Sequence, residues 1–182
     1  TSHHLTVYKN IIDISFALFI PLPEAVKEDE AVEDLLSATE KILNEYPKDV
    51  NYRYLYNVFH FLSFEYYHQL KLHKKESQYF EKINDELPAL LLYNFCCFSS
   101  RLLSSKVERY LHLQKEDALY AESLQLMESY VPDQADVCTY VSFMKHLAVS
   151  AFYADKYNEA IVHLNKLLNE VSFKDFVHAE IE

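Results

Sequence analysis

Glu65 and His68 are two side chains that could bind a metal ion together, because they lie three residues apart. On a helix this spacing places a carboxylate and an imidazole on one face, as in di-metal helix bundles. Such sites need a second Glu-x-x-His motif and further Glu residues, and the sequence has no second motif. His60 lies two helical turns from His68, too far for both to chelate one ion. We therefore interpret Glu65 and His68 as a hydrogen-bonded or exposed pair, and we expect no metal and no cofactor.

The cysteines do not indicate catalysis. A nucleophilic Cys needs a nearby His and a lowered pKa, whereas Cys96 and Cys97 lie within an apolar segment, where Cys acts as a small hydrophobic residue. Together with Cys138 they make an odd number, which suits neither a disulfide framework nor a paired zinc site. The adjacent His3 and His4 are interpreted as a solvated terminus rather than a ligand pair. We expect a non-enzymatic, cytoplasmic protein.

Composition restricts the fold class further. The 182 residues are 50% hydrophobic and include no Gly. Phosphate-binding loops, dinucleotide fingerprints and nucleophile elbows all depend on Gly, as do most tight β-hairpins. A formal net charge of -11 disfavours binding to nucleic acid. These observations predict helices joined by short polar turns.

Hydrophobic periodicity supports an all-α fold with more than about 65% helix and no sheet. Amphipathic segments alternate with segments that are apolar on nearly all sides, as stacked helix hairpins require. One short segment, Tyr52 to Val58, alternates like a strand, but its apolar pattern continues too far for an ordinary strand. The amphipathic segments are Val32 to Tyr46, Tyr79 to Leu87, Tyr120 to Val131 and Tyr157 to Val171, and the apolar ones are 51–72, 89–113 and 137–154.

Proline spacing indicates an internal repeat. Pro47, Pro88 and Pro132 each follow an amphipathic segment, at intervals of 41 and 44 residues. Proline just past a helix end stops the helix, so we expect a helix to end before each of them. A period of about 40 residues is typical of solenoids and helical arrays.

The longest apolar run, Ile11 to Leu22, is interrupted by Asp13 and Pro21 and is shorter than the roughly 20 residues needed to cross a bilayer. Lys9 precedes it as in a signal peptide, but no small-residue cleavage pattern follows. We interpret it as part of a buried helix at 1–22 and expect no membrane span. The first residue is not Met, and the last residues resemble the start of another helix, which is consistent with a piece of a longer protein.

The segment from Met144 to Ser172 resembles a tetratricopeptide repeat. Its second helix opens with Asp155-Lys156-Tyr157-Asn158-Glu159-Ala160-Ile161, similar to the family's Gly-Asp-Tyr-x-x-Ala-Ile turn. Ala148 and Ala160 stand at the two small positions where helices touch, whereas Asp155 replaces the usual Gly. Segments 73–88 and 101–132 resemble the family more loosely. The resemblance implies a single domain over 1–182, in which stacked antiparallel hairpins near 23–72, 73–113, 115–154 and 156–182 form a short right-handed superhelix.

The resemblance also implies a function. In the family, the first helices of the repeats line a concave groove that binds a peptide or a helix, so we expect a protein-protein interaction scaffold with an unidentified protein partner. The alternative is a helical regulatory or substrate-recognition domain of a larger enzyme or transcription regulator. The groove positions implied here include Phe61, Glu65, His68, Lys145, Val149 and Phe152.

Overall fold

The computed structural model describes residues 2–20, 29–49, 51–91, 98–130 and 136–171. These residues form eight helices and no strand, and 87% of them are helical. The prediction of an all-α fold is confirmed for this part of the chain. No helix in it is long and apolar enough to cross a membrane.

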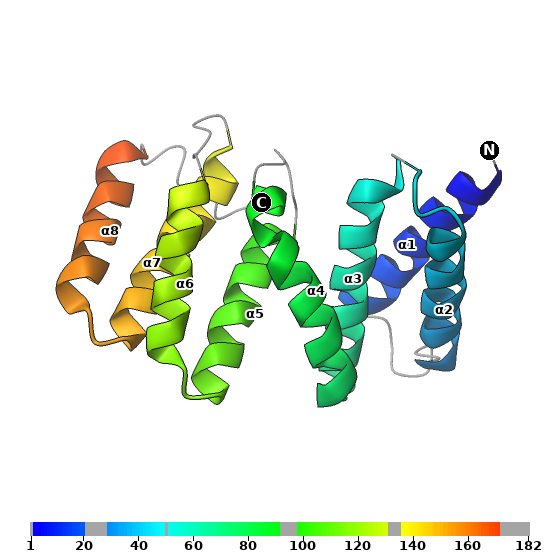
Figure 1. Ribbon diagram of the computed structural model, residues 1–182, viewed down its shortest axis with the longest axis horizontal. Coiled ribbons are helices and arrows are strands. Elements are labelled where there is room, and N and C mark those ends of the chain that lie inside the picture. The colour runs from blue at the N-terminus through cyan, green and yellow to red at the C-terminus, as the bar shows by residue number, and fades with distance from the viewer. Residues whose placement is uncertain (1, 21–28, 50, 92–97, 131–135, 172–182) are drawn as a thin grey trace. The chain divides into compact units, whose positions relative to one another are not determined.

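The helices follow one another through short connections (Figure 1). The segment around Tyr54 with the strand-like alternation belongs to the third helix. The helix bounds are α1 Ser2–Phe19, α2 Asp29–Glu45, α3 Tyr52–Gln69, α4 His73–Leu91, α5 Ser99–His112, α6 Glu116–Ser129, α7 Val137–Tyr153 and α8 Tyr157–Glu170.

The chain divides into two compact units, residues 1–86 and 87–182. The first unit contains α1, α2, α3 and most of α4, and the second contains the end of α4 and α5 to α8. Each unit has its own buried core, and we describe each by itself.

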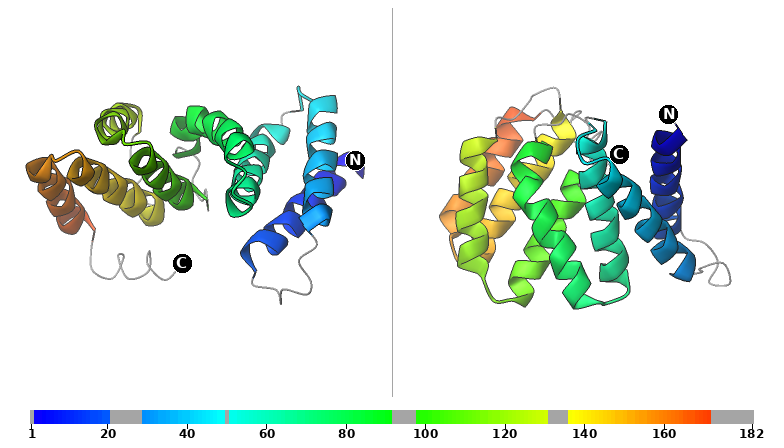
Figure 2. Two further views of the ribbon diagram at one scale, coloured as in Figure 1. Left: turned by 90° about the horizontal axis from the view of Figure 1, so that it is seen from below. Right: turned by 45° about the vertical axis from the view of Figure 1, so that its right-hand side comes forward.

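In the first unit, α3 is the central helix and packs against α1 and α2 (Figure 2). Contacts between aromatic rings join α3 to α4. The ring centroids of Phe64 and Phe80 are 5.7 Å apart, and those of Phe59 and Tyr79 are 6.2 Å apart in an edge-on arrangement. Tyr52 and Phe59 are at most 1% exposed. Such rings each bury a large apolar area, so the aromatic content of this segment is mostly core.

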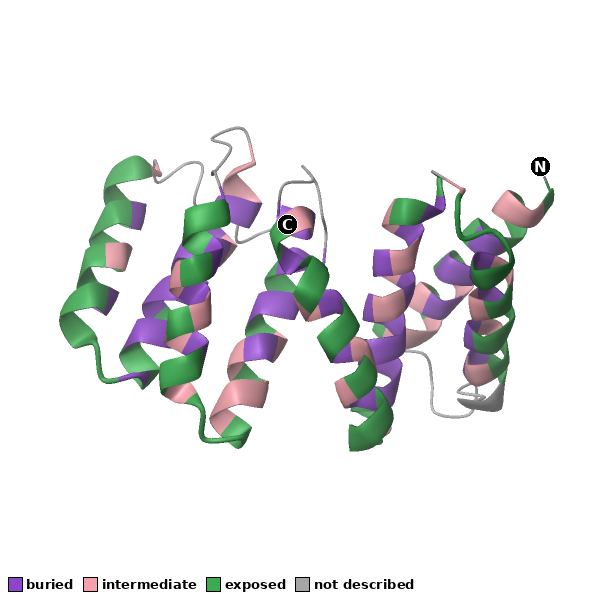
Figure 3. Ribbon diagram, viewed as in Figure 1, coloured by how far each residue is buried: buried purple, intermediate pink, exposed green. Residues whose placement is uncertain are grey.

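In the second unit, α7 takes the central place and packs against α5, α6 and α8. Phe143, Leu147 and Ala151 are almost completely buried along it, whereas α8 buries only Ala160 and Leu167 (Figure 3). The start of α7 is capped by Asp136, whose side chain accepts a hydrogen bond from the backbone N–H of Thr139 at 3.1 Å. This cap satisfies an N–H group that the helix itself cannot pair.

Three tight turns with the same backbone geometry join α3 to α4, α5 to α6 and α7 to α8. Lys71, Gln114 and Asp155 adopt positive φ angles of 57°, 54° and 57°. In each turn the next N–H donates to the carbonyl five residues earlier, for example Lys156 to Ala151 at 2.8 Å. This is the Schellman helix ending, which normally uses Gly at the positive φ position. A chain without Gly makes it here with Lys, Gln and Asp.

The three prolines do not behave alike. Pro47 follows the end of α2, as predicted, whereas Pro88 lies inside α4, so the prediction that a helix ends before Pro88 is wrong. Pro88 has no N–H to donate, but it lies in the last turn, where burial of Leu87, Leu90 and Leu91 holds the helix together. Pro132 lies outside the described residues, as do Cys96 and Cys97.

Two predicted buried segments also need correction. Segment 89–113 is not one apolar helix, because α4 ends at Leu91 and α5 begins at Ser99. The helix expected to be buried at 1–22 is α1, which buries Val7, Asn10, Ile11 and Ile14 but leaves an apolar face exposed. That face consists of Leu5, Tyr8, Ile12 and Phe16, whereas the ring of Phe19, at the end of the helix, contacts Phe61 of α3. The opposite side of α1 packs on α2 and α3.

Candidate functional site

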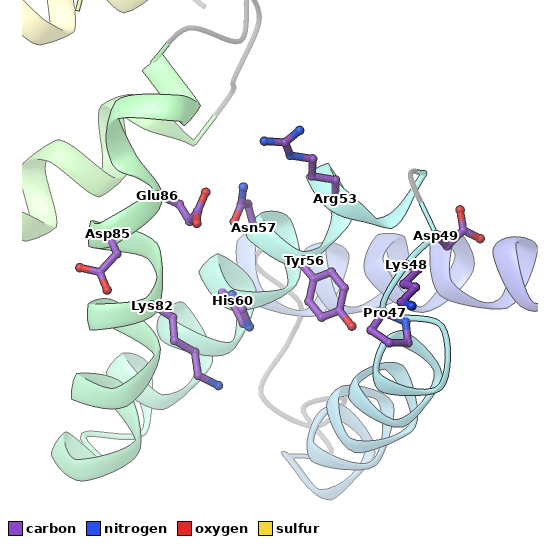
Figure 4. A pocket seen from close by; sticks show the side chains of 10 residues that line it. All are labelled: Pro47, Lys48, Asp49, Arg53, Tyr56, Asn57, His60, Lys82, Asp85 and Glu86. Atoms are coloured by element: carbon purple, nitrogen blue, oxygen red, sulfur yellow. The ribbon is translucent and has the colours of Figure 1, made fainter. Parts of the chain in front are cut away.

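A groove of about 650 Å³ opens in the first unit, between the α2–α3 connection, α3 and α4 (Figure 4). Most of the side chains that line it are polar or charged, and the aromatic core of the first unit lies beneath them. The lining residues are Pro47, Lys48, Asp49, Arg53, Tyr56, Asn57, His60, Lys82, Asp85 and Glu86.

The two helices bring these side chains to one place by helical periodicity. Arg53, Tyr56, Asn57 and His60 follow the steps of three and four residues that define one face of α3. Most of the other residues of α3 are buried, so the groove face is one of the few parts of this helix that a ligand can reach. Lys82, Asp85 and Glu86 form the facing stripe on α4 by the same rule.

His60 is a neutral imidazole in this groove at physiological pH. Burial, followed by the positive charge of Lys82, lowers the pKa of His60 to about 4. The centroid of its ring lies 6.0 Å from that of the Tyr79 ring and 6.1 Å from that of the Tyr56 ring. A neutral imidazole has one donor and one acceptor nitrogen, so His60 can form hydrogen bonds with a ligand without contributing charge.

Two hydrogen bonds to backbone carbonyls lie at the end of the groove near the α2–α3 connection. The hydroxyl of Tyr56 donates to the carbonyl of Leu43 at 2.5 Å, which ties α3 to the end of α2. Burial raises the pKa of Tyr56, so the hydroxyl stays protonated and remains a donor. The N–H of Asp49 donates to the carbonyl of Tyr46 at 3.0 Å. These two hydrogen bonds tie α3 and the start of the α2–α3 connection to the end of α2.

The charges of the groove are balanced, in contrast to the acidic chain as a whole. Lys48, Arg53 and Lys82 provide positive charge, and the carboxylates of Asp49, Asp85 and Glu86 provide negative charge. Ligand pockets for small molecules are enclosed and mostly apolar. An open groove with both signs of charge suits ion pairs and hydrogen bonds to a polar chain.

The groove residues implied by the repeat resemblance occupy different environments in the first unit. Phe61 and Glu65 are 3% and 0% exposed, so they lie in the core and not on an accessible wall. The ring of Phe61 contacts that of Phe19 from α1, because α1 covers this side of α3. His68 is exposed, and its Nδ1 lies 3.2 Å from Oε1 of Glu76 on α4.

In the second unit, the predicted residues Lys145, Val149 and Phe152 share one exposed face of α7. The ring of Phe152 meets Tyr153 and Tyr157 edge-on, at 5.6 and 5.5 Å. This face is an exposed apolar and aromatic surface next to the α7–α8 turn. The structure therefore describes two groups of predicted residues, one in each unit, and the groove in the first unit contains none of them.

Comparison with known proteins matched no family model, no curated protein and no solved structure.

The sequence contained a signal for the groove that periodicity analysis could have used. Segment 51–72 is apolar on nearly all sides, and Arg53, Asn57 and His60 interrupt it at helical spacing. A polar stripe on an otherwise apolar helix marks the side that faces solvent or a ligand. The contribution of Asp49 and Pro47 had no comparable signal, because it depends on how α2 and α3 meet.

Proposed function

We propose that this chain is a tetratricopeptide-like interaction module that binds a peptide or helix of another protein in the groove of the first unit. The observation that carries the proposal is the groove itself, with its balanced charges and its neutral imidazole. A surface that carries both signs of charge is complementary to a peptide with both acidic and basic side chains.

The repeated turns support the tetratricopeptide-like part of the proposal. Lys71, Gln114 and Asp155 recur at intervals of 43 and 41 residues with the same backbone conformation. Asp155, which stands where the family has Gly, adopts the positive φ that Gly would adopt. Three hairpins with one turn geometry are what a degenerate helical repeat would produce.

The groove also supports binding over catalysis. Binding needs complementary surface, which the groove offers through Arg53, Lys82 and Glu86. General acid-base catalysis works best with a pKa near the working pH, whereas the pKa of His60 is about 4. His60 therefore contributes as a hydrogen-bonding partner.

Selection from a random peptide library displayed on phage tests the proposal. The wild-type chain is the target, and selected peptides are then synthesised and measured by fluorescence anisotropy. We expect acidic side chains in the peptides to pair with Arg53 and Lys82, so Arg53→Glu and Lys82→Glu each weaken binding at least about tenfold, or about 1.4 kcal/mol. Lys115→Glu, an exposed charge reversal outside the groove, serves as the control and leaves affinity unchanged.

Two outcomes would contradict the groove assignment. Peptides that bind both groove variants as tightly as the wild type would exclude the groove as the site. Loss of binding in Phe152→Ala alone would place the interaction on the exposed face of α7 instead. Circular dichroism of each variant distinguishes a lost contact from a lost fold.

A further inference from the structure

Three side chains with metal-binding atoms lie close together where the start of α1 meets the α2–α3 connection. His3 and His4 lie in the first turn of α1, and Asp49 lies 45 residues further along the chain. One nitrogen of each imidazole and one carboxylate oxygen all lie within 4.8 Å of one another. Among the described residues this is the only group of three such side chains. The interpretation of His3 and His4 as a solvated terminus does not account for this convergence.

The spacing is close to that of a coordination shell. A tetrahedral zinc site with bonds of about 2.0–2.2 Å has ligand atoms roughly 3.4 Å apart. Nε2 of His4 and Oδ2 of Asp49 are 2.5 Å apart, where they share a hydrogen bond. An ion that replaces this bond requires the two atoms to separate by about 1 Å, which side-chain rotation allows at a partly exposed site. Both side chains are partly exposed, at 26% and 18%.

Each ligand candidate is also oriented by a neighbour, as metal ligands usually are. Oδ1 of Asp49 accepts hydrogen bonds from the backbone N–H and the side-chain amide of Asn51, both at 3.0 Å, which directs Oδ2 toward His4. Nδ1 of His3 lies 2.6 Å from the hydroxyl of Tyr52. The His3 ring stacks on Tyr46, with centroids 4.2 Å apart and planes 5° from parallel. Such partners fix ring orientation and ligand basicity in metal sites.

We infer that His3, His4 and Asp49 form a binding site for a divalent transition-metal ion, with zinc as the ion that suits it best. Two imidazoles and one carboxylate are zinc ligands, and three protein ligands leave the fourth tetrahedral position for water or a ligand. Calcium and magnesium prefer shells of oxygen atoms, so they are poorly matched to this set. The bound ion links the start of α1 to the α2–α3 connection.

The site adjoins the groove but does not depend on it. Asp49 is the residue that the two share, since it lines the groove and also carries the proposed metal-binding oxygen. The zinc site makes no use of Arg53 or Lys82. Zinc binding and peptide binding can therefore be measured separately, and failure of one leaves the other proposal standing.

Isothermal titration of the full chain with zinc chloride, after removal of metals by a chelator, tests the inference. We expect saturable binding of one ion per chain, and magnesium chloride at the same concentration should not displace it. Asp49→Ala and His4→Ala should each weaken zinc binding at least about tenfold, and Tyr52→Phe should weaken it by about tenfold through loss of the contact with His3. His112→Ala, an exposed His in α5, is the matched control and should bind zinc as the wild type does.

A second measurement covers variants that fold poorly. Zinc should raise the melting temperature of the wild type and of His112→Ala, because it binds only the folded arrangement of α1 and the α2–α3 connection. Asp49→Asn, which preserves side-chain size, should show a much smaller rise. Absence of saturable binding, or equal binding by the wild type, Asp49→Ala and His4→Ala, would overturn the inference.

Discussion

The groove of the first unit and the interior of the second unit each contain a histidine whose pKa is lowered to about 4, and they use it differently. Burial is the main cause for both His60 and His146, and a Lys charge adds to it in each case. His60 lies on the wall of an open groove, whereas His146 is 4% exposed in the core. The same shift in pKa therefore marks a group that a ligand can reach in one unit and a structural group in the other.

The surroundings of His146 explain its structural role. Its Nε2 lies 2.9 Å from the hydroxyl of Ser123 on α6, and that hydroxyl lies 3.2 Å from the hydroxyl of Ser150. The charge of Lys106 on α5 is the second cause of the low pKa. A Ser and a His at hydrogen-bonding distance could suggest a nucleophile, but Ser123 is 0% exposed. The comparison teaches that a perturbed pKa indicates a functional site only when the group is also accessible.

Truncation of phenylalanines should give the largest difference between buried and accessible positions. Phe61→Ala removes a ring that is 3% exposed, so we expect a loss of about 3–5 kcal/mol in the free energy of unfolding. Phe152→Ala removes a ring that is 54% exposed, and it should cost less than about 1 kcal/mol. Urea unfolding followed by circular dichroism measures both. Equal losses would mean that Phe152 is as structural as Phe61.

Acidification should destabilise the chain through His146. Its pKa falls from 6.5 when unfolded to about 4 when folded, so the unfolded chain binds more protons between these pH values. The stabilisation is therefore complete above pH 6.5 and is lost as the pH falls toward 4, with an upper limit of about 3 kcal/mol. His146→Gln should flatten the curve of unfolding free energy against pH in this window.

A second histidine sharpens this test. His60→Gln should flatten the curve less than His146→Gln, because water reaches the groove and solvates the charged ring. A slope that persists fully in His146→Gln would show that other groups cause the acid sensitivity.

The smallest expected effect concerns the turns, where the two units are alike. Lys71→Gly in the first unit and Gln114→Gly in the second remove a β-carbon from a positive φ position. Each should stabilise the chain by up to about 1 kcal/mol, since Gly adopts this conformation without steric cost. Melting temperatures would report the change. Glu81→Gly, within the exposed face of α4, should instead destabilise by about 1 kcal/mol. A decrease in both turn variants would contradict the shared turn geometry.

Local features of the sequence were enough for the helices. The apolar segment 137–154 became α7, Val137–Tyr153, and the amphipathic stripe from Tyr157 to Val171 became α8, Tyr157–Glu170. The absence of Gly and the steps of three and four residues act within one or two helical turns, so they can be recognised without the fold. The same local reasoning wrongly predicted that a helix ends before Pro88, because burial of the neighbouring side chains outweighs the cost of proline in the last turn of α4.

Which faces are covered was decided by tertiary packing alone. Phe61 and Phe152 were predicted to play the same part, but α1 packs over Phe61, and Phe152 is left at the surface. The meeting of His3 with Asp49 also depends on how α1 lies against the α2–α3 connection. Periodicity places a residue on one face of its own helix, whereas contacts between distant segments follow from which helices pack together, and a single sequence carries no direct record of that choice.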